Sequence, residues 1–212
     1  MLELGIKLLV SYLLGSLNGA LLIGKLKGVD IRSVGSGNAG GTNALRTQGP
    51  VFAFFVMVID VGKGWLPAAL LPTLALPGIP LDPEVSRTWL TLACGGAAIV
   101  GHCYPVWFNF AGGKGAATTV GVLIAVAPGL LLPGAIVFVS VLVLTGYVGL
   151  STISGAVAMP VWLAATRFAD HQPTFVFLVM LAIFIIYTHR SNIQRLRDGT
   201  ENRSERVMLF RR

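Results

Sequence analysis

The chain has 212 residues, of which 54% are hydrophobic and only 12% are Asp, Glu, Lys or Arg. This composition is too apolar for an ordinary soluble domain and is typical of a protein that crosses a membrane several times. The net charge of +7 does not indicate a nucleic-acid partner, because the basic residues fall in connecting segments and in the C-terminal tail. There they set membrane orientation and attract anionic lipid headgroups. We therefore expect an all-α, polytopic membrane helix bundle that forms a single domain over residues 1–212.

The first apolar stretch, residues 2–24, is long enough to cross a bilayer. It has Glu3 and Lys7 near its start and no small-residue cleavage site, so we expect a spanning helix and not a removable signal peptide. Three basic residues follow it at once, namely Lys25, Lys27 and Arg32. The positive-inside rule therefore predicts a cytoplasmic location for the segment after residue 24 and an N-terminus outside.

Residues 34–46 read VGSGNAGGTNALR, a glycine-rich segment between two apolar stretches. Gly35, Gly37, Gly40 and Gly41 permit positive φ, which turns several backbone N–H groups toward one concave face that binds anionic oxygens. A planar guanidinium at the end of the segment suits phosphate or carboxylate. A flexible linker is the alternative, but a linker needs no interleaved hydrogen-bonding side chains. The candidate phosphate-binding residues here are Gly35, Ser36, Gly37, Asn38, Gly40, Thr42, Asn43 and Arg46.

Residues 51–76 form the second expected span, and they contain Asp60 and Lys63 one helical turn apart. This pair is either a structural intramembrane ion pair or the polar floor beneath an active site, since charges at that depth seldom face lipid. The turn over residues 77–86 lacks a positive bias and is expected outside, and residues 88–104 cross back.

A second glycine-rich segment, residues 101–115, reads GHCYPVWFNFAGGKG and also lies between apolar stretches. Gly112, Gly113, Lys114 and Gly115 have the chemistry of a phosphate cradle. They lack the P-loop spacing, in which four residues separate the first glycine from a Gly-Lys pair, and no strand is expected before them. A nucleotide triphosphatase is therefore excluded. Two glycine-rich, cation-bearing segments in one small membrane protein indicate a site that handles phosphate.

Two short or broken spans are expected in residues 118–146, because Pro-Gly pairs begin at positions 128 and 133 of this apolar stretch. Residues 151–166 and 174–187 complete seven spans, with the N-terminus outside and the C-terminus cytoplasmic. Only an even number of crossings after the second glycine-rich segment keeps every polar segment on one side of the membrane.

The third polar segment, residues 189–203, reads HRSNIQRLRDGTENR. His189 and Asn192 are three positions apart and share a helical face, and Glu201 follows an expected turn at Asp198 and Gly199. A basic stop-transfer tail would account for the arginines of this segment. It would leave His189, Asn192 and Glu201 unexplained.

The stretches GSGNAGGTNALR, GHCYPVWFNFAGGKGAAT and HRSNIQRLRDGTE occur in this order between membrane spans. They resemble the three signature segments of the bacterial acyl-phosphate:glycerol-3-phosphate acyltransferase family, and the resemblance covers nearly the whole chain. It implies a seven-helix, multi-pass enzyme of the bacterial inner membrane, with its signature segments on the cytoplasmic side. The implied reaction uses acyl phosphate and glycerol 3-phosphate, and gives 1-acyl-glycerol 3-phosphate and phosphate. This is the first acylation of phospholipid synthesis.

The resemblance also implies roles for single residues. The two phosphorylated substrates would be lined by Ser36, Arg46, Lys114, His189 and Asn192. The acyl phosphate group would be received by the backbone of Gly112, Gly113, Lys114 and Gly115. Glu201 would order the third segment or pair with Arg46 or Lys114. Either His189 or the leaving phosphate would take the proton of the glycerol hydroxyl.

Three positions depart from the family pattern. Gly41 stands where the family usually has Ala, and Gly149 and Thr152 replace common serines. Ser151 and Ser154 are the substrate-binding candidates of this stretch, but the last two departures leave open which of Ser151, Thr152 and Ser154 supplies the hydroxyl. Because an acyl phosphate is already an activated anhydride, no cofactor and no covalent enzyme nucleophile are expected. No metal and no obligatory protein partner are expected either, and membrane lipids surround the protein.

Three other classes of protein are disfavoured by the sequence. The H-x-x-x-x-D pair of soluble-type glycerolipid acyltransferases is missing, since Trp107, Val176 and Gln194 stand five positions after the three histidines. The clustered aspartates that a CDP-alcohol phosphotransferase needs for divalent metal are missing too. An organic-phosphate transporter would carry inverted repeats and midplane polar residues reachable from both faces, whereas the polar segments here are expected on one face.

Overall fold

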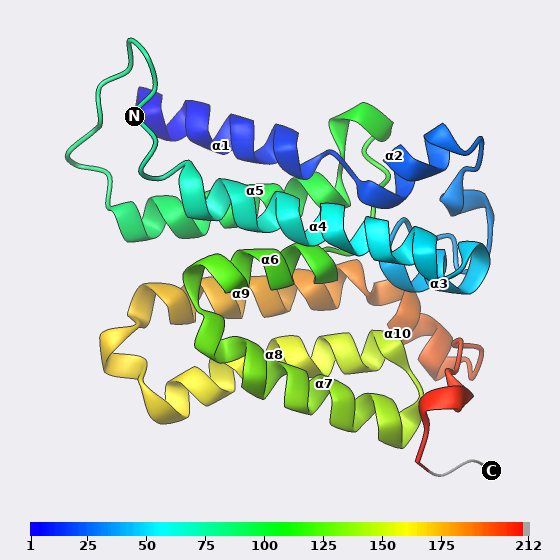
Figure 1. Ribbon diagram of the computed structural model, residues 1–212. Coiled ribbons are helices and arrows are strands. Elements are labelled where there is room, and N and C mark those ends of the chain that lie inside the picture. Colours follow the sequence, from blue (N-terminus) through cyan, green and yellow to red (C-terminus); the bar gives the residue numbers. More distant parts are fainter. Residues whose placement is uncertain (210–212) are drawn as a thin grey trace. The chain divides into compact units, whose positions relative to one another are not determined.

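The computed structural model describes residues 1–209 and has the all-helical fold that the sequence predicts (Figure 1). The chain divides into two compact units, Met1–Val126 and Ala127–Arg212. Both glycine-rich segments belong to the first unit. The third polar segment belongs to the second, and the single domain expected over the whole chain stays a prediction.

The first unit is a bundle in which α5 contacts α1, α4 and α6 (Figure 1). Its helices are α1 (Leu2–Gly15), α2 (Gly19–Leu26), α3 (Gly41–Gln48), α4 (Pro50–Leu70), α5 (Arg87–Cys103) and α6 (Ala116–Val126). Two 3-10 turns, η1 (Ile31–Ser33) and η2 (Val106–Phe108), lie in the connections that lead to α3 and α6. The helices α4 and α5 confirm the second and third expected spans, although α4 ends earlier than predicted.

Glycines allow the helices of this unit to pack closely. A Cβ atom on Gly15 of α1 would collide with the backbone of Ala98 on α5, and one on Gly101 of α5 would collide with the backbone of Tyr12. Gly64 of α4 meets the backbone of α6 in the same way. Close approach through small residues is typical of helices within a membrane, where apolar side chains gain little by leaving lipid.

The single helix expected over residues 2–24 is wrong in one respect, because α1 and α2 are separate helices bent by 48°. The break ends at Asn18, which is the N-cap of α2: its Oδ1 accepts the N–H of Leu21 at 3.1 Å. Its side chain is completely buried. A break inside a membrane segment requires protein partners for the freed backbone groups, since lipid supplies none.

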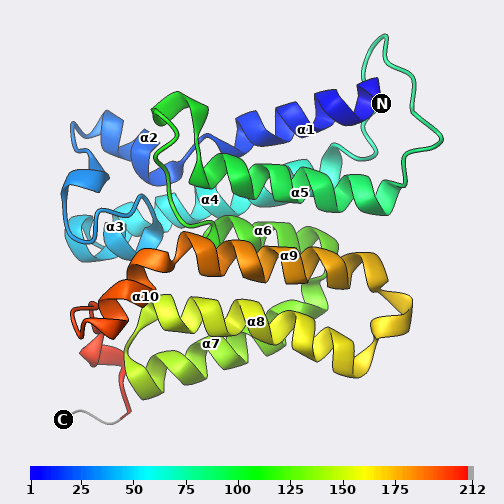
Figure 2. The same ribbon diagram turned by 180° about the vertical axis from the view of Figure 1, so that it is seen from behind.

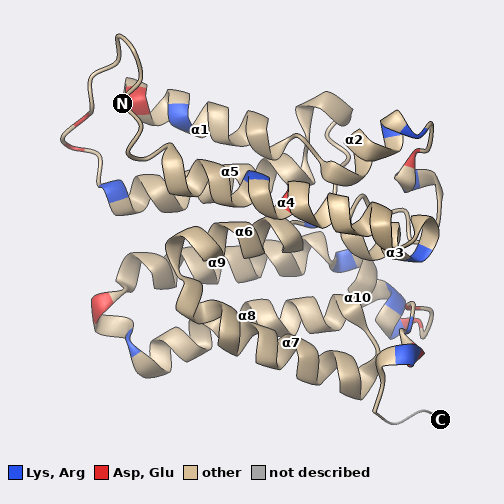
Figure 3. Ribbon diagram, in the orientation of Figure 1, with Lys and Arg blue, Asp and Glu red and all other residues tan. Residues whose placement is uncertain are grey.

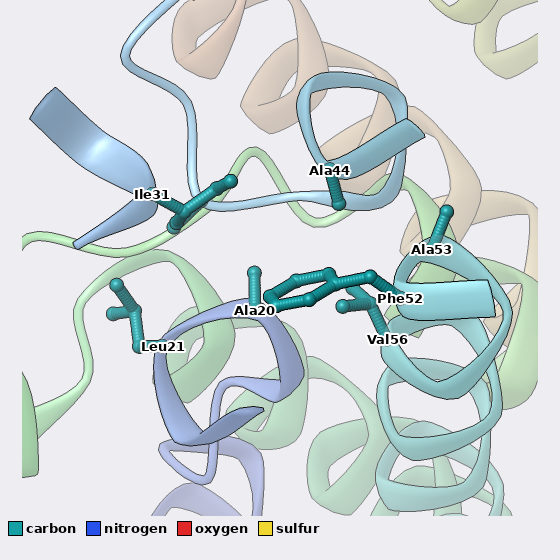
Figure 4. Close-up of a cluster of buried hydrophobic side chains, with 8 residues drawn as sticks. Ala20, Leu21, Ile31, Ala44, Phe52, Ala53 and Val56 are labelled. Carbon is teal, nitrogen blue, oxygen red and sulfur yellow. The ribbon is translucent and has the colours of Figure 1, made fainter. Parts of the chain in front are cut away.

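A hydrophobic cluster carries the first glycine-rich segment. Phe52 and Val56 of α4 pack with Ala20 of α2, Ile31 of η1 and Ala44 of α3 (Figure 4). The members come from both sides of the segment in the sequence. Their burial therefore fixes the start of the loop and the helix that follows it against the first turns of α4.

The opposite end of the first unit carries a buried charge cluster. Lys7 of α1 is completely buried and donates to Glu3 Oε1 at 2.7 Å and to the Pro72 carbonyl at 3.2 Å. Arg87, at the start of α5, donates to the two Glu3 oxygens at 2.5 and 3.0 Å. These bonds hold the turn after α4 to the starts of α1 and α5. Figure 3 shows charged residues at both ends of the unit and few along its helices.

In the second unit α8 packs between α7 and α9 (Figure 2). Its helices are α7 (Leu131–Thr145), α8 (Val148–Thr166), α9 (Gln172–Thr188) and α10 (Arg190–Arg197). Three 3-10 turns accompany them, η3 (Pro128–Leu130), η4 (Phe168–Asp170) and η5 (Glu205–Val207). The turn η3 lies between α6 and α7, so the interruption expected at Pro128 and Gly129 is confirmed, whereas the one expected at Pro133 and Gly134 is wrong because both residues lie within α7.

Within residues 1–209, four helical stretches are long and apolar enough to cross a membrane, at residues 50–70, 87–108, 128–145 and 148–166. The count rises to six if each of the bent pairs α1–α2 and α9–α10 is one span. The helix α6 has 11 residues, which extend for about 16 Å, roughly half of the hydrocarbon core. A polytopic membrane fold is confirmed, whereas the number of seven spans and their orientation stay predictions.

Candidate active site

The first glycine-rich segment forms an ordered loop and not a flexible linker. Gly35 and Gly37 have left-handed φ values of 59° and 71°, as the glycine pattern predicts. The same prediction is wrong for Gly40, whose φ of −153° is extended, and for Gly41, which begins α3. The N–H of Gly40 donates to the Asn38 carbonyl at 3.0 Å. The loop thus uses some of its backbone donors to hold its own shape.

Asn43 organises this loop from inside. Its side chain is 1% exposed, and its Nδ2 donates to the carbonyls of Ile31 and Val34, each at 3.0 Å. Its Oδ1 accepts the N–H of Ser36 at 2.9 Å. Three hydrogen bonds use most of the capacity of one amide. The structure therefore assigns loop shaping to Asn43, and its expected contact with substrate stays a prediction.

The remaining polar side chains of the segment are accessible. Arg46 and Thr42 lie on α3 and are exposed, and Ser36 and Asn38 are half-buried. Thr42 stands in the first turn of α3, where backbone N–H groups have no acceptor within the helix. Side chains and helix-start amides thus provide the means by which this segment can bind an anion.

The second glycine-rich segment folds back onto the end of α5. The N–H groups of Gly112 and Gly113 donate to the carbonyls of Cys103 and His102, each at 3.1 Å. These acceptors are among the last carbonyls of α5, which have no donor within the helix. The bonds close the helix end and fix the position of the glycine pair.

Two non-glycine residues make the turn that precedes this glycine pair. Asn109 and Phe110 have positive φ values of 55° and 56°, and for Phe110 no sequence signal predicts this conformation. Gly115 has a φ of 87° and leads directly into α6. Lys114 therefore stands beside a helix N-terminus, where free N–H groups and a cation both favour an anion.

The two glycine-rich segments meet at Gly113. A Cβ atom there would lie 2.6 Å from the Ala39 carbonyl oxygen and would collide with the imidazole of His102. Asn18 donates to the same Ala39 carbonyl at 3.1 Å. Since glycine alone permits this approach, it brings the segment that carries Arg46 against the segment that carries Lys114.

Arg32 ties the same two segments together at a second place. Its Nη1 donates to the carbonyls of Phe108 and Ala111, at 3.2 and 3.1 Å. Its Nη2 donates to Asp30 Oδ2 at 2.8 Å. Hydrogen bonding from the Arg32 side chain holds the pKa of Asp30 below its usual range, and the carboxylate raises the pKa of Arg32. From the sequence, Arg32 was expected only to set membrane orientation.

The ion pair expected in the second span is confirmed. Lys63 Nζ lies 2.9 Å from Asp60 Oδ1, and both side chains are almost completely buried in α4. His102 of α5 is buried beside them, with Nδ1 3.4 Å from the same oxygen. A polar cluster inside the bundle thus adjoins the helix end that holds Gly113.

An apolar groove of about 500 Å³ runs along α4. Its lining comes from α4 and α6, with the side chains of Phe54, Met57, Val58, Val61, Trp65 and Ile124, and with Gly62. Met57 also touches the first glycine-rich segment, because a Cβ atom on Gly41 would lie 2.7 Å from its sulfur. The groove therefore begins at the segment that carries Arg46.

In the second unit, His189 is held in one tautomer at the junction of α9 and α10. Its side chain is nearly buried, and Nδ1 lies 2.8 Å from the Ile185 carbonyl oxygen. A carbonyl only accepts hydrogen bonds, so Nδ1 carries the proton. The neutral ring then has its lone pair on Nε2, which is the atom able to act as a base.

Glu201 orders the third segment. Its Oε1 accepts from Asn192 Nδ2 at 2.6 Å, and its Oε2 accepts from Arg195 Nε at 2.6 Å. The side chain is only 5% exposed, so these charge-assisted bonds are well shielded from water. These bonds are consistent with the ordering role expected for Glu201, and its pairing with Arg46 or Lys114 stays a prediction. The expected turn before it is confirmed by Gly199, whose φ is 69°.

The hydroxyl candidates of α8 donate to their own helix. Ser151 is completely buried and donates to the Tyr147 carbonyl at 2.8 Å, and Thr152 donates to the Val148 carbonyl at 2.9 Å. Their oxygen lone pairs remain as acceptors. Ser154 is half-buried, and a substrate contact from any of the three stays a prediction.

The structure brings the predicted residues together in two groups. Ser36, Arg46 and Lys114 belong to the joined glycine-rich segments of the first unit, and His189, Asn192 and Glu201 form one segment of the second. The convergence of all three segments stays a prediction. Within residues 1–209, no group of three His, Cys, Asp or Glu side chains is placed to hold a metal ion.

Three structural partners escaped the sequence analysis, namely Asn18, Arg32 and Arg195. Asn18 offered a signal, because an amide next to a glycine inside an apolar stretch marks a helix break. Arg195 lies three positions after Asn192 and thus on the same helical face. For the link that Arg32 makes between the segments the sequence has no signal, because those two partners are carbonyls about eighty residues away.

These features define a class of protein first: a multi-pass membrane protein with glycine-rich, cation-bearing segments suited to phosphate. Residues 5–199 match the family model of glycerol-3-phosphate acyltransferase. The glycerol-3-phosphate acyltransferase of Salinibacter ruber is 44% identical over 216 residues, which cover 95% of this chain and 93% of that protein. The corresponding protein of Geobacillus kaustophilus is 43% identical over 195 residues, with 92% of each chain covered.

Two solved structures are similar to this fold. They are crystal structures of PlsY, an integral membrane glycerol 3-phosphate acyltransferase, in a glycerol 3-phosphate form and a lysophosphatidic acid form. The TM-scores are 0.80 and 0.79, at 34% and 33% sequence identity, with 94% of each chain covered. The chain therefore belongs to the glycerol-3-phosphate acyltransferase family.

Proposed function

We propose that this protein transfers the acyl group of an acyl phosphate to glycerol 3-phosphate, and so catalyses the first acylation of bacterial phospholipid synthesis. The observation that carries the proposal is the junction of the two glycine-rich segments at Gly113, which places Arg46 and Lys114 on one joined pair of loops. We assign the reaction to the cytoplasmic face of the inner membrane, because the basic residues gather in these segments and in the tail.

The reaction needs no covalent enzyme intermediate. A hydroxyl oxygen of glycerol 3-phosphate attacks the acyl carbon and forms the ester bond. The bond between that carbon and the phosphate oxygen breaks, and phosphate leaves with the electron pair. What the enzyme must supply is neutralisation of two phosphates held close together and alignment of the hydroxyl with the acyl carbon.

Each joined segment supplies one part of an anion site. Arg46, with Ser36 and Thr42, contacts one phosphate. Lys114, with the N–H of Gly115 and the first amides of α6, contacts the other. The phosphate cradle was expected over Gly112–Gly115. We limit it to Lys114 and Gly115, because the N–H groups of Gly112 and Gly113 already donate to the end of α5.

The proton of the attacking hydroxyl has two possible acceptors. One is Nε2 of His189, whose lone pair is fixed there by the bond from Nδ1 to the Ile185 carbonyl. The other is the leaving phosphate, in which case His189 is the imidazolium and only donates to phosphate, from Nε2. His189→Asn separates the two routes, because loss of a general base costs about 10² to 10⁴ in rate. The phosphate route leaves the pH dependence of that variant like that of the natural protein.

The acyl chain occupies the apolar groove along α4. Met57 links this groove to the first glycine-rich segment, so a chain lying in it has its activated end near the anion site. The proposed substrate thus matches the site in both of its parts, a phosphate and a long apolar tail.

Incubation of the purified protein with palmitoyl phosphate and glycerol 3-phosphate tests the function. The expected result is release of inorganic phosphate that depends on both substrates, with formation of 1-acyl-glycerol 3-phosphate. Lys114→Ala is the control for contaminating activity. No release, together with phosphate uptake into vesicles that contain the protein, would replace the enzyme by a transporter.

A further inference from the structure

The broken first helix needs partners that lipid cannot provide, and the buried ion pair of α4 provides them. Asp60 Oδ1 accepts the N–H of Gly19, the first residue of α2, at 3.0 Å. Lys63 Nζ donates to the carbonyl of Leu17, in the break itself, at 3.2 Å. The anion thus stands at a helix start and the cation at a helix end, where the helix dipoles favour each of them.

His102 of α5 connects the Asp60 carboxylate to the second glycine-rich segment. His102 lies with Nδ1 3.4 Å from Asp60 Oδ1 and is almost completely buried. Its carbonyl accepts the N–H of Gly113 at 3.1 Å, and its ring faces the α-carbon of that glycine so closely that no side chain fits. The position of Gly113 therefore follows the position of the His102 ring.

A parallel connection reaches the first glycine-rich segment through α2. Asn18 caps α2 with Oδ1 and donates from Nδ2 to the Ala39 carbonyl at 3.1 Å. Gly113 packs against that same carbonyl. Both connections start at Asp60 and end at the contact between Ala39 and Gly113.

We infer that Asp60, Lys63 and His102 are positioning residues of the acyltransferase, which set the separation of the two glycine-rich segments and thereby of Arg46 and Lys114. The three residues act by holding the α1–α2 break and the end of α5 to one point of α4. The inference rests on the proposed reaction for its kinetic consequence and on the buried contacts alone for its geometry.

A matched control exists in the same unit. Lys7 is also buried in an ion pair, with Glu3, but its contacts hold the turn after α4 at the other end of the bundle. Loss of Lys7 leaves Glu3 paired with Arg87. Lys7→Met therefore tests whether removal of a buried charge alone, without displacement of the glycine-rich segments, changes turnover.

The kinetic test compares Asp60→Asn, His102→Leu and His102→Asn with Lys7→Met, at a temperature where thermal unfolding shows every variant to be folded. We expect at least a tenfold loss of kcat for Asp60→Asn and His102→Leu. His102→Asn keeps a polar side chain beside Asp60 and should recover part of that loss. Lys7→Met should keep kcat within twofold. Folded Asp60→Asn and His102→Leu with kcat within twofold of the natural protein would overturn the inference.

A second readout does not depend on activity. Ala39 is completely buried at the contact of the two segments, so a cysteine placed there reacts with a thiol reagent only when the segments separate. We expect Asp60→Asn to accelerate this labelling several-fold and Lys7→Met to leave it unchanged. If the natural protein fails to use acyl phosphate, the proposed function falls and the labelling alone decides the positioning role. Equal labelling rates in all backgrounds would overturn that role.

Discussion

Lys114 and Arg46 are the residues on which the charge balance of the proposed site depends. Each stands on one of two joined glycine-rich segments, and in the proposed reaction each offsets the charge of one substrate phosphate. Lys114→Ala and Arg46→Ala should each lower kcat by about 10² to 10³, the usual cost of removing one fixed stabiliser of developing charge. Steady-state phosphate release measures the effect. Lys25→Ala, an exposed cation on α2, should stay within twofold. Near-normal turnover by a folded Lys114→Ala variant would contradict the site.

Gly113 contributes to the site by lacking a side chain and not by carrying a charge. A methyl group there meets the Ala39 carbonyl and the His102 ring. Gly113→Ala should therefore push the two segments apart and lower kcat/KM by at least about tenfold, since small misplacements of reacting groups are costly. Gly5→Ala is the matched control, because a Cβ atom at Gly5 meets nothing within 4 Å. Unchanged kinetics in Gly113→Ala would show that the close contact is dispensable.

The residue types of the site were predictable, but their partners were not. Glycines interleaved with Arg and Lys marked two segments in the sequence, and the structure joins them at Gly113. The same pattern was misleading about Gly40 and Gly41, because a helix, and not a further turn, follows the loop. The amides of Gly112 and Gly113 were expected to bind substrate, yet they close the end of α5. Which donors are used internally depends on the packing of distant elements, and sequence spacing does not contain that information.

At the scale of elements, α10 and the turn after it depend on Glu201. Glu201→Ala removes the acceptor that Asn192 Nδ2 and Arg195 Nε share. We expect a loss of about 1.5–3 kcal/mol in stability, as for hydrogen bonds to charged groups. Glu201→Gln keeps an acceptor for Asn192 and should lose less. Thermal unfolding in detergent ranks the variants, and equal loss in both would show that the Asn192 bond contributes little.

The groove along α4 makes a prediction about acyl-chain length. Gly62 lies in the groove, and a Cβ atom there meets nothing within 4 Å, so a larger residue fits the helix and fills the groove. Gly62→Leu should raise KM for palmitoyl phosphate several-fold and leave an eight-carbon acyl phosphate almost unaffected. Gly5→Leu is the control on α1. If both donors respond equally in Gly62→Leu, the acyl chain lies elsewhere.

Helix existence was easier to predict than helix continuity. The apolar stretches gave α4, α5, α8 and α9, because burial in lipid demands about twenty apolar residues in a row. The break between α1 and α2 was missed, although Asn18 and Gly19 mark it. A hydropathy average over residues 2–24 hides the break, because its backbone groups at Leu17 and Gly19 are satisfied by Lys63 and Asp60 from another helix.

For the whole molecule, the proposed reaction requires the three polar segments to face the same compartment. Single cysteines at exposed positions test this, with Ser33 next to the first glycine-rich segment, Ala111 within the second, Thr200 in the third segment and Glu84 in the turn after α4. The native Cys94 and Cys103 are buried and should react slowly. In inside-out membrane vesicles, an impermeant thiol reagent should label the first three cysteines and spare the one at position 84. In vesicles of the opposite orientation the pattern should reverse.

The apolar composition between these positions gives the physical reason for the expected labelling, since an even number of crossings must separate any two segments that share a side. Labelling of Thr200→Cys together with Glu84→Cys would place the third segment outside, and a single cytoplasmic site for two phosphorylated substrates would then be impossible.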